Sequence, residues 1–169
     1  MRFFLTGFMG SGKSFWGQKM AAHHHIPFID LDQFIENRAS CTIAELFAAE
    51  GEEAFRKLEA ECLREIIHIE PRFIMATGGG TPCFYDNMDV MKAHGVTIYL
   101  KAGTDYLLNN LRNDTAHRPL LAPFSEEEMI YFIQQKAGER ALYYSQAHHI
   151  VEAESLNDSI FERILLPYV

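Results

Sequence analysis

The chain has 169 residues, a length that predicts one domain over residues 1–169 with a substantial core. Its residues are 48% hydrophobic and 22% charged, as in ordinary globular proteins, and no apolar run is long enough to cross a membrane. The formal net charge of −8 argues against nucleic acid and anionic membranes as partners, because both attract basic surfaces.

Short apolar segments and helix-forming segments alternate along the chain. The predicted strands cover residues 2–6, 26–29, 73–76, 96–100 and 149–151. The predicted helices cover residues 15–22, 33–39, 42–62, 86–94, 104–111, 125–144 and 160–166, with a break at Gly51 and a capping box formed by Ser125 and Glu128. This alternation predicts a three-layer α/β fold with a five-stranded parallel sheet. We expect residues 23–25, three consecutive histidines, to form an exposed loop rather than a metal site.

Residues Gly7–Ser14 follow the first predicted strand and match the P-loop pattern G-x-x-x-x-G-K-[ST]. Glycines let such a loop fold so tightly that successive backbone N–H groups converge on an anion, and the next helix directs its N-terminus at the same phosphates. Lys13 supplies a positive charge for the β- and γ-phosphates, and the Ser14 hydroxyl can ligate Mg²⁺. The predicted nucleotide-binding residues of this segment are Gly10, Ser11, Gly12, Lys13 and Ser14. The strand–loop–helix context favours a nucleoside triphosphate site over a glycine-rich turn with a solvated lysine.

Two further strand ends carry residues that suit a site for anionic ligands, which bind parallel sheets at the carboxyl ends of the strands. The second predicted strand ends in Asp30 and Asp32, which would face the same side of an extended chain. Two carboxylates beside a triphosphate are tolerable if Mg²⁺ or a polar substrate lies between them; the alternative is that Asp32 caps the next helix. The third strand runs into Gly78, Gly79 and Gly80, which would let another molecule approach the backbone closely.

An acidic chain that binds anionic ligands has to gather its few cations at one place. The candidates are Arg56, Arg118 and Arg140. Each arginine also has an interpretation without a role in binding. Arg56 could form a surface i,i+3 pair with Glu59. Arg118 could be a solvated loop charge, and Arg140 could have only ordinary helix neighbours. Together the three would supply planar donors that clamp a carboxylate or neutralise a transferring phosphoryl group.

Taken in chain order, these motifs resemble those of the shikimate kinase family over essentially the whole chain. The resemblance rests on residues 7–14, 28–32, 35–36, 43–47, 51–52, 55–56, 77–80, 118–121, 139–140 and 143. The P-loop alone is shared by very many NTPases, whereas the ordered set of D-x-D, F-R, G-G-G and R-P-L-L motifs is far more specific. The resemblance implies a P-loop NTPase fold related to nucleoside monophosphate kinases, with strand order 2-3-1-4-5. It also implies transfer of the γ-phosphoryl group of ATP to the 3-hydroxyl of shikimate, with one Mg²⁺ ion.

The resemblance further implies a role for each matching residue. Shikimate would be held by Asp32, Arg56, Gly78, Gly79, Gly80 and Arg140. In this assignment the two arginines bind the carboxylate, and Asp32 binds ring hydroxyls and is the candidate base. Asp30 and Ser14 would organise Mg²⁺, whereas Lys13 and Arg118 would face the phosphates. Arg112 is the candidate for stacking on adenine, residues 33–62 are the expected substrate-binding region, and residues 112–124 are the expected lid.

Two other functions remain open from the residues alone. One is a kinase of another small acceptor, such as gluconate or a nucleoside monophosphate. The other is a non-catalytic nucleotide-binding module, although the N-K-x-D motif of a guanine-specific switch does not occur in the sequence. We expect a monomer whose partners are the small molecules ATP and shikimate. Three widely spaced cysteines without a C-x-x-C motif, together with the lack of a signal peptide, predict a cytoplasmic protein.

Overall fold

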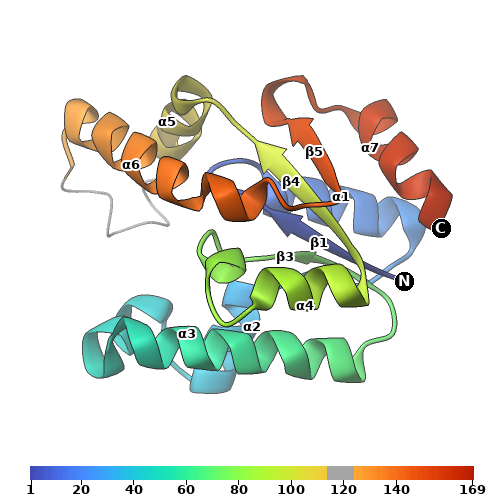
Figure 1. Cartoon of the computed structure of the whole chain (residues 1–169), viewed down its shortest axis with the longest axis horizontal. Coiled ribbons are helices and arrows are strands. Elements are labelled where there is room, and N and C mark those ends of the chain that lie inside the picture. Colours follow the sequence, from blue (N-terminus) through green and yellow to red (C-terminus); the bar gives the residue numbers. More distant parts are fainter. Residues whose placement is uncertain (114–123) are drawn as a thin grey trace.

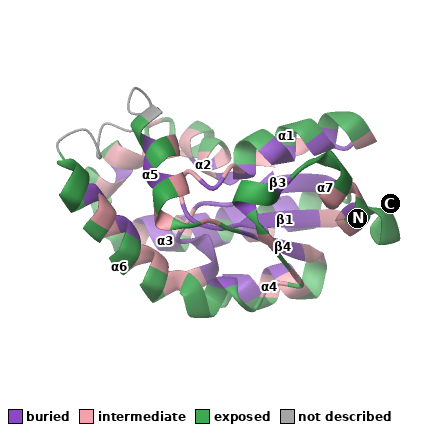
Figure 2. Ribbon diagram, turned by 90° about the horizontal axis from the view of Figure 1, so that it is seen from above, coloured by how far each residue is buried: buried purple, intermediate pink, exposed green. Residues whose placement is uncertain are grey.

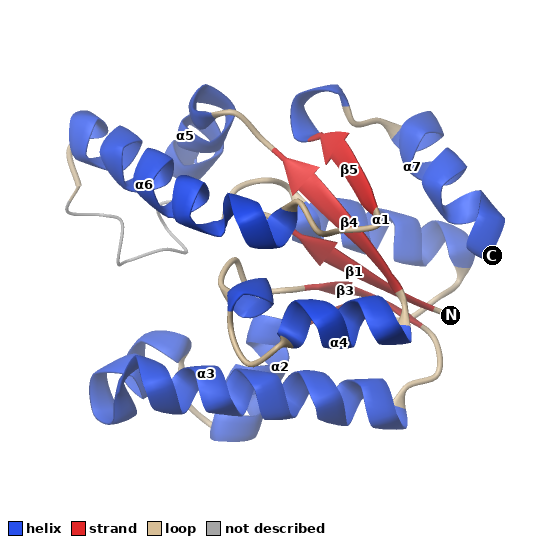
Figure 3. Cartoon of the chain, in the orientation of Figure 1, coloured by secondary structure: helices blue, strands red, loops and turns tan. Residues whose placement is uncertain are grey.

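The computed structural model describes residues 1–113 and 124–169, and a five-stranded sheet lies at its centre (Figure 1). The strands are β1 (Arg2–Thr6), β2 (Phe28–Asp30), β3 (Phe73–Ala76), β4 (Val96–Lys101) and β5 (His149–Glu152). Their order is β2-β3-β1-β4-β5, and every neighbouring pair is parallel. The predicted fold class and strand order are therefore confirmed. Because the strands run the same way, their carboxyl ends meet at one edge of the sheet (Figure 3).

Helices connect the strands and cover the sheet. They are α1 (Lys13–His24), α2 (Leu31–Ala39), α3 (Ile43–Ile69), α4 (Asn87–His94), α5 (Thr104–Asn113), α6 (Glu126–Tyr144) and α7 (Asp158–Leu165). The capping box predicted at the start of α6 is confirmed. The loop prediction for residues 23–25 is wrong for His23 and His24, because α1 continues to His24 and only His25 lies beyond it. None of the helices in the described ranges is both long and apolar enough to span a bilayer.

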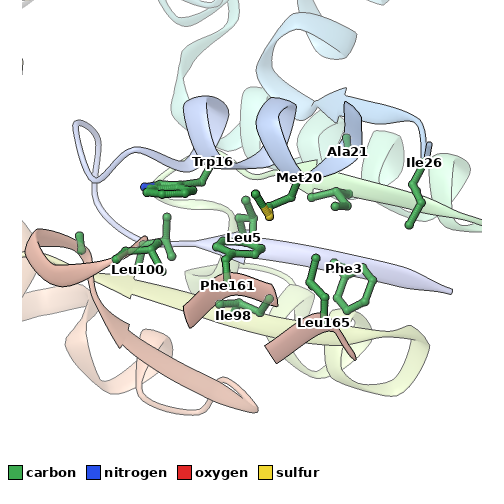
Figure 4. Packing of buried hydrophobic residues seen from close by; sticks show 13 residues of the cluster. Phe3, Leu5, Trp16, Met20, Ala21, Ile26, Ile98, Leu100, Phe161 and Leu165 are labelled. Carbon is green, nitrogen blue, oxygen red and sulfur yellow. The ribbon is translucent and has the colours of Figure 1, made fainter. Parts of the chain in front are cut away.

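Successive side chains of β1 point to opposite faces of the sheet, as strand geometry requires. Phe3 and Leu5 are fully buried in a cluster with Trp16 of α1 and Phe161 of α7, whose rings stack at 5.9 Å (Figure 4). Phe4 belongs to the cluster on the other face, with residues of α3 and α4. Both faces are thus covered, and β1 and β3 are buried along almost their whole length (Figure 2).

Helix α3 is divided by a kink at Gly51, as the sequence predicts. Gly51 has φ 84° and ψ 173°, a backbone conformation that side chains other than hydrogen disfavour. The first part begins with a capping box between Thr42 and Glu45. The longer second part packs on the sheet and carries Arg56 and Glu59. Both parts contribute to the core, since Leu46 before the kink is buried in the same cluster as Phe55 after it.

Replacing Gly138 with alanine should raise the free energy of unfolding by roughly 0.5–1 kcal/mol, because alanine loses less conformational entropy inside a helix. Gly138 lies within α6, and a Cβ built there meets no atom within 4 Å. Gly95→Ala is the contrasting variant, because a Cβ on Gly95 would lie 2.4 Å from the carbonyl oxygen of Arg2. Urea titration of both variants checks the prediction. A destabilised Gly138→Ala protein or a stabilised Gly95→Ala protein would contradict it.

Candidate active site

The segment Gly7–Ser14 forms a tight loop between the end of β1 and the start of α1. Gly10 and Gly12 have φ values of 82° and 94°, in the left-handed region that glycine enters most readily. Gly12 precedes α1 without a side-chain cap, so the first N–H groups of the helix remain available to an anion. Beside them, the buried hydroxyl of Ser11 has no hydrogen-bond partner among the residues that the structure describes. This is the local geometry of a phosphate-binding loop.

Lys13 is buried at the base of the loop. Its Nζ donates hydrogen bonds to the carbonyl oxygens of Gly7 and Phe8, each over 2.9 Å. Its charge offsets part of the rise that burial causes in the pKa of Asp32, which lines the same cavity. The loop thus holds an ammonium group at the position from which it can compensate phosphate charge.

A hydroxyl and a carboxylate meet at the end of β2. The Oγ of Ser14 donates to Oδ2 of Asp30 over 2.9 Å. The other oxygen of Asp30 accepts from the backbone N–H groups of Asp32 and Gln33, so that Asp30 caps α2. The alternative in which Asp32 caps this helix is therefore wrong. The two aspartates do not lie on one extended strand as predicted either, because Asp32 is in the first turn of α2.

Both aspartates nevertheless line one cavity of about 460 Å³ at the carboxyl end of the sheet. Its lining residues are Met9, Lys13, Ser14, Asp30, Asp32, Gln33, Glu36, Thr77 and Gly79. Burial, followed by the charges of Asp30 and Glu59, raises the pKa of Asp32 from 3.8 to about 6. A carboxylate whose pKa is closer to neutral is better suited to accept a proton during a reaction.

The glycine segment 78–80 lies directly against three predicted substrate-binding side chains. Cβ atoms built on the three glycines would lie, in chain order, 2.8, 3.0 and 2.4 Å from side-chain atoms of Asp32, Arg140 and Arg56. A larger residue at any of these positions would press on one of these side chains, so the three glycines let the side chains keep their present positions. The structure thus brings together residues from α2, α3 and α6 that are far apart in the sequence.

Arg56 is already held in place by protein groups. Its Nη1 donates to Oε2 of Glu59 over 2.9 Å, and its guanidinium lies 4.5 Å from the centre of the Phe84 ring. Glu59 is fully buried, and its other oxygen accepts a 2.6 Å hydrogen bond from the Thr81 hydroxyl. The alternative of a surface pair between Arg56 and Glu59 is therefore wrong. Glu59 was missed as a site residue because its i,i+3 spacing is the same for exposed and buried pairs.

Replacing Arg56 with alanine should lower the free energy of unfolding by about 3–5 kcal/mol, because it leaves the buried Glu59 carboxylate without its counterion. Urea titration measures the loss. The double variant Arg56→Ala/Glu59→Gln is the control, since it removes the unpaired charge and should recover part of the stability. A double variant whose loss of stability equals the sum of the losses in Arg56→Ala and Glu59→Gln would contradict this account.

Arg140 projects from α6 toward the P-loop. Its guanidinium lies 5.6 Å from the centre of the Phe8 ring, and its positive charge acts on the phenol of Tyr144 one turn later. The Tyr144 hydroxyl donates to the carbonyl oxygen of Gly79, and burial raises the pKa of this phenol. α6 is thereby joined to the glycine segment, which fixes the position of Arg140 next to the cavity.

Two predicted nucleotide-binding residues are not placed in the cavity by the described part of the chain. Arg112 is exposed near the end of α5 and forms an ion pair with Glu126 of α6. The end of α5 does border the P-loop, since Asn110 donates to the carbonyl oxygen of Gly10 over 2.8 Å. Arg118 lies outside the described residues, as does most of the predicted lid.

Comparisons with known proteins agree with this geometry. Residues 9–167 match the family model described as shikimate kinase. The shikimate kinase of Bacteroides thetaiotaomicron is 43% identical over 158 residues, which cover 94% of this chain and 90% of that protein. A crystal structure of shikimate kinase from the same species covers 99% of this chain and 97% of its own, with 39% identity and a TM-score of 0.91. Shikimate kinase from Acinetobacter baumannii in complex with shikimate is 29% identical, with a TM-score of 0.85 and coverages of 99% and 94%. This chain belongs to the shikimate kinase family.

Proposed function

We propose that this protein transfers the γ-phosphoryl group of ATP to the 3-hydroxyl of shikimate, a step of aromatic amino acid biosynthesis. The observation that carries the proposal is the convergence of Asp32, Arg56 and Arg140 on the glycine segment 78–80 beside the P-loop. Membership of the family supports the same reaction, and the Acinetobacter baumannii relative has been solved with shikimate bound.

Two arginines and one carboxylate match the chemistry of a compact, hydroxylated carboxylic acid. Arg56 and Arg140 are planar donors that bind the carboxylate of the acceptor. Asp32 accepts a hydrogen bond from the attacking hydroxyl, while glycines 78–80 let the ring approach the backbone. Arg56→Ala is therefore expected to raise the KM for the acceptor more than it lowers kcat.

Ser14 and Asp30 are the residues that would hold Mg²⁺. Their oxygens lie 2.9 Å apart, and hydroxyl and carboxylate oxygens are the hard donors that this ion prefers. When bound, Mg²⁺ neutralises charge on the phosphates of ATP. The backbone of Gly10, Ser11 and Gly12 surrounds the phosphates. Lys13 leaves its hydrogen bonds to the loop carbonyls and binds the β- and γ-phosphates. Arg118 binds the same phosphates, and Arg112 contacts adenine.

The transfer step forms a bond between the 3-hydroxyl oxygen and the γ-phosphorus. It breaks the bond from that phosphorus to the oxygen bridging the β- and γ-phosphates, which leaves with ADP. The hydroxyl proton passes to Asp32, whose pKa of about 6 suits it to this role. Catalysis rests on positioning and charge neutralisation. Closure of residues 112–124 and of the substrate-binding region 33–62 excludes water, so that ATP is not hydrolysed. The protein acts as a monomer in the cytoplasm.

A coupled assay of ADP release with ATP, Mg²⁺ and shikimate tests the proposal. Saturable turnover with shikimate is expected, with none when gluconate or a nucleoside monophosphate replaces it. Turnover with one of those acceptors alone would overturn the assigned acceptor and keep the kinase reaction. Tight ATP binding without turnover on any acceptor would instead indicate a non-catalytic nucleotide-binding module.

A further inference from the structure

Three polar side chains at the far end of α1 have no part in phosphoryl transfer. α1 begins at the P-loop, and its last turn lies about 15 Å further along the helix axis. There it packs beside α7, whose Phe161 and Leu165 belong to the same core cluster (Figure 4). Glu162, on the turn between those two core residues, meets His23 and His24 of α1.

Both imidazole rings approach a single carboxylate oxygen. Nε2 of His24 lies 3.0 Å from Oε1 of Glu162, and Nε2 of His23 lies 3.3 Å from the same atom. The three atoms all lie within 4.8 Å of one another. The two rings are nearly perpendicular, with centroids 5.1 Å apart, so their nitrogen-bearing edges converge without stacking.

Two of these atoms are buried but lack hydrogen bonds. Nε2 of His24 and Oε1 of Glu162 are shielded from solvent, and neither has a partner in hydrogen-bonding geometry within the described ranges. Buried polar atoms are normally satisfied, so an ion between them would account for the arrangement. The two distances from imidazole nitrogen to carboxylate oxygen, 3.0 and 3.3 Å, fit a tetrahedral metal, whose bonds of about 2.0–2.1 Å hold its ligand atoms about 3.3 Å apart.

We propose that His23, His24 and Glu162 bind a divalent first-row transition metal, with Zn²⁺ as the preferred ion and water in the fourth position. Two imidazoles and one carboxylate form a donor set that suits Zn²⁺. Mg²⁺ prefers oxygen ligands in an octahedral arrangement, so the ion used with ATP would not compete here. The bound metal would tie the P-loop helix to α7, next to the ion pair between Lys19 and Asp158. It would stabilise the fold without entering the active-site cavity.

Titration of the untagged protein with Zn²⁺ in excess Mg²⁺, followed by calorimetry, tests the proposal. One equivalent of Zn²⁺ should bind and raise the Tm, because a ligand that binds only the folded state stabilises it. His24→Asn and Glu162→Gln should each weaken Zn²⁺ binding by at least about tenfold and remove the rise in Tm. Both variants should keep the wild-type kcat. Replacing Zn²⁺ with Co²⁺ should give the visible absorption of a tetrahedral rather than an octahedral ion.

His25→Asn is the matched control. His25 is the next residue, it is exposed and outside the cluster, and asparagine tolerates its left-handed backbone. This variant should bind Zn²⁺ like the wild type. The Tm of each variant without metal shows whether it is folded, independently of binding. The proposal would be overturned if the wild type did not bind Zn²⁺, or if His24→Asn and Glu162→Gln bound it as tightly as the wild type. An equal loss of Zn²⁺ affinity in His24→Asn, Glu162→Gln and His25→Asn would also overturn it.

Discussion

Replacing Lys13 with alanine should lower kcat by about a thousandfold, because it removes a positive charge that the loop holds beside the transferring phosphoryl group. Nζ of Lys13 is held inside the loop by the carbonyl oxygens of Gly7 and Phe8. Its removal takes away charge that the transition state needs, in a site where water cannot screen the deficit. The coupled assay at saturating ATP and shikimate measures kcat, and a separate nucleotide titration reports ATP affinity.

Lys19→Ala provides the control for this prediction. Lys19 lies on the same helix, but its side chain is half-exposed and pairs with Asp158 of α7. A surface pair of this kind contributes little to stability, so the variant should keep wild-type kinetics. Wild-type kcat/KM in Lys13→Ala would remove this lysine from the mechanism. An equal loss in both variants would point to damage of α1 rather than to lost chemistry.

Replacing Asp32 with asparagine should lower kcat by about 10²–10⁴-fold, the range for loss of a general base, while raising the stability of the protein without ligands. The pKa of Asp32 is raised from 3.8 to about 6, so the fold holds its ionised form at a cost. That cost is at most about 3 kcal/mol at neutral pH, from a shift of roughly two pKa units. Denaturant titration measures the gain, and the coupled assay measures the loss.

The pH dependence gives this prediction a second test. Below about pH 4 the carboxyl is protonated in both folded and unfolded chains, so this group's ionisation should cause no difference in stability between the wild type and Asp32→Asn. As the pH rises from about 4 to 6, only the unfolded carboxyl ionises, and the wild type loses stability relative to Asp32→Asn. Above about pH 6 the difference should stay constant. If Asp32→Asn were less stable than the wild type at pH 7, the fold would not disfavour the ionised form of Asp32, and the prediction would be contradicted.

The parts of the fold that depend on local backbone chemistry could be predicted from the sequence. Gly10 and Gly12 adopt the positive φ values that a P-loop needs, and Gly51 divides α3 where the helical pattern breaks. Each of these features follows from what one residue type permits. The order of the strands came from the family resemblance, since alternation of strands and helices alone is compatible with several arrangements.

The parts of the site that depend on burial could not be predicted. Arg56 and Glu59 have the spacing of an exposed helix pair, and only the packing of α3 against the segment after β3 shows that both are buried. Asp30 caps α2 because β2 ends at Asp30 and the helix begins at Leu31, so the chain is no longer extended between the two aspartates. The sequence places His23 and His24 in a loop because they stand between a predicted helix and a predicted strand. No glycine or asparagine follows them to mark that the helix ends later, at His24. The role of Arg118 stays a prediction.

The position of β1 in the sheet has a consequence for the newly made chain. β1 is the middle strand, yet its partners β3 and β4 begin only at Phe73 and Val96. At synthesis rates of about 5–20 residues per second, the ribosome needs about 3–14 s to pass from Phe4 to Phe73. Throughout that interval the apolar residues of β1 have no neighbouring strand, and parallel pairing over such a separation is slow. A chaperone that binds apolar nascent segments should therefore occupy β1 first and release it once β4 has emerged.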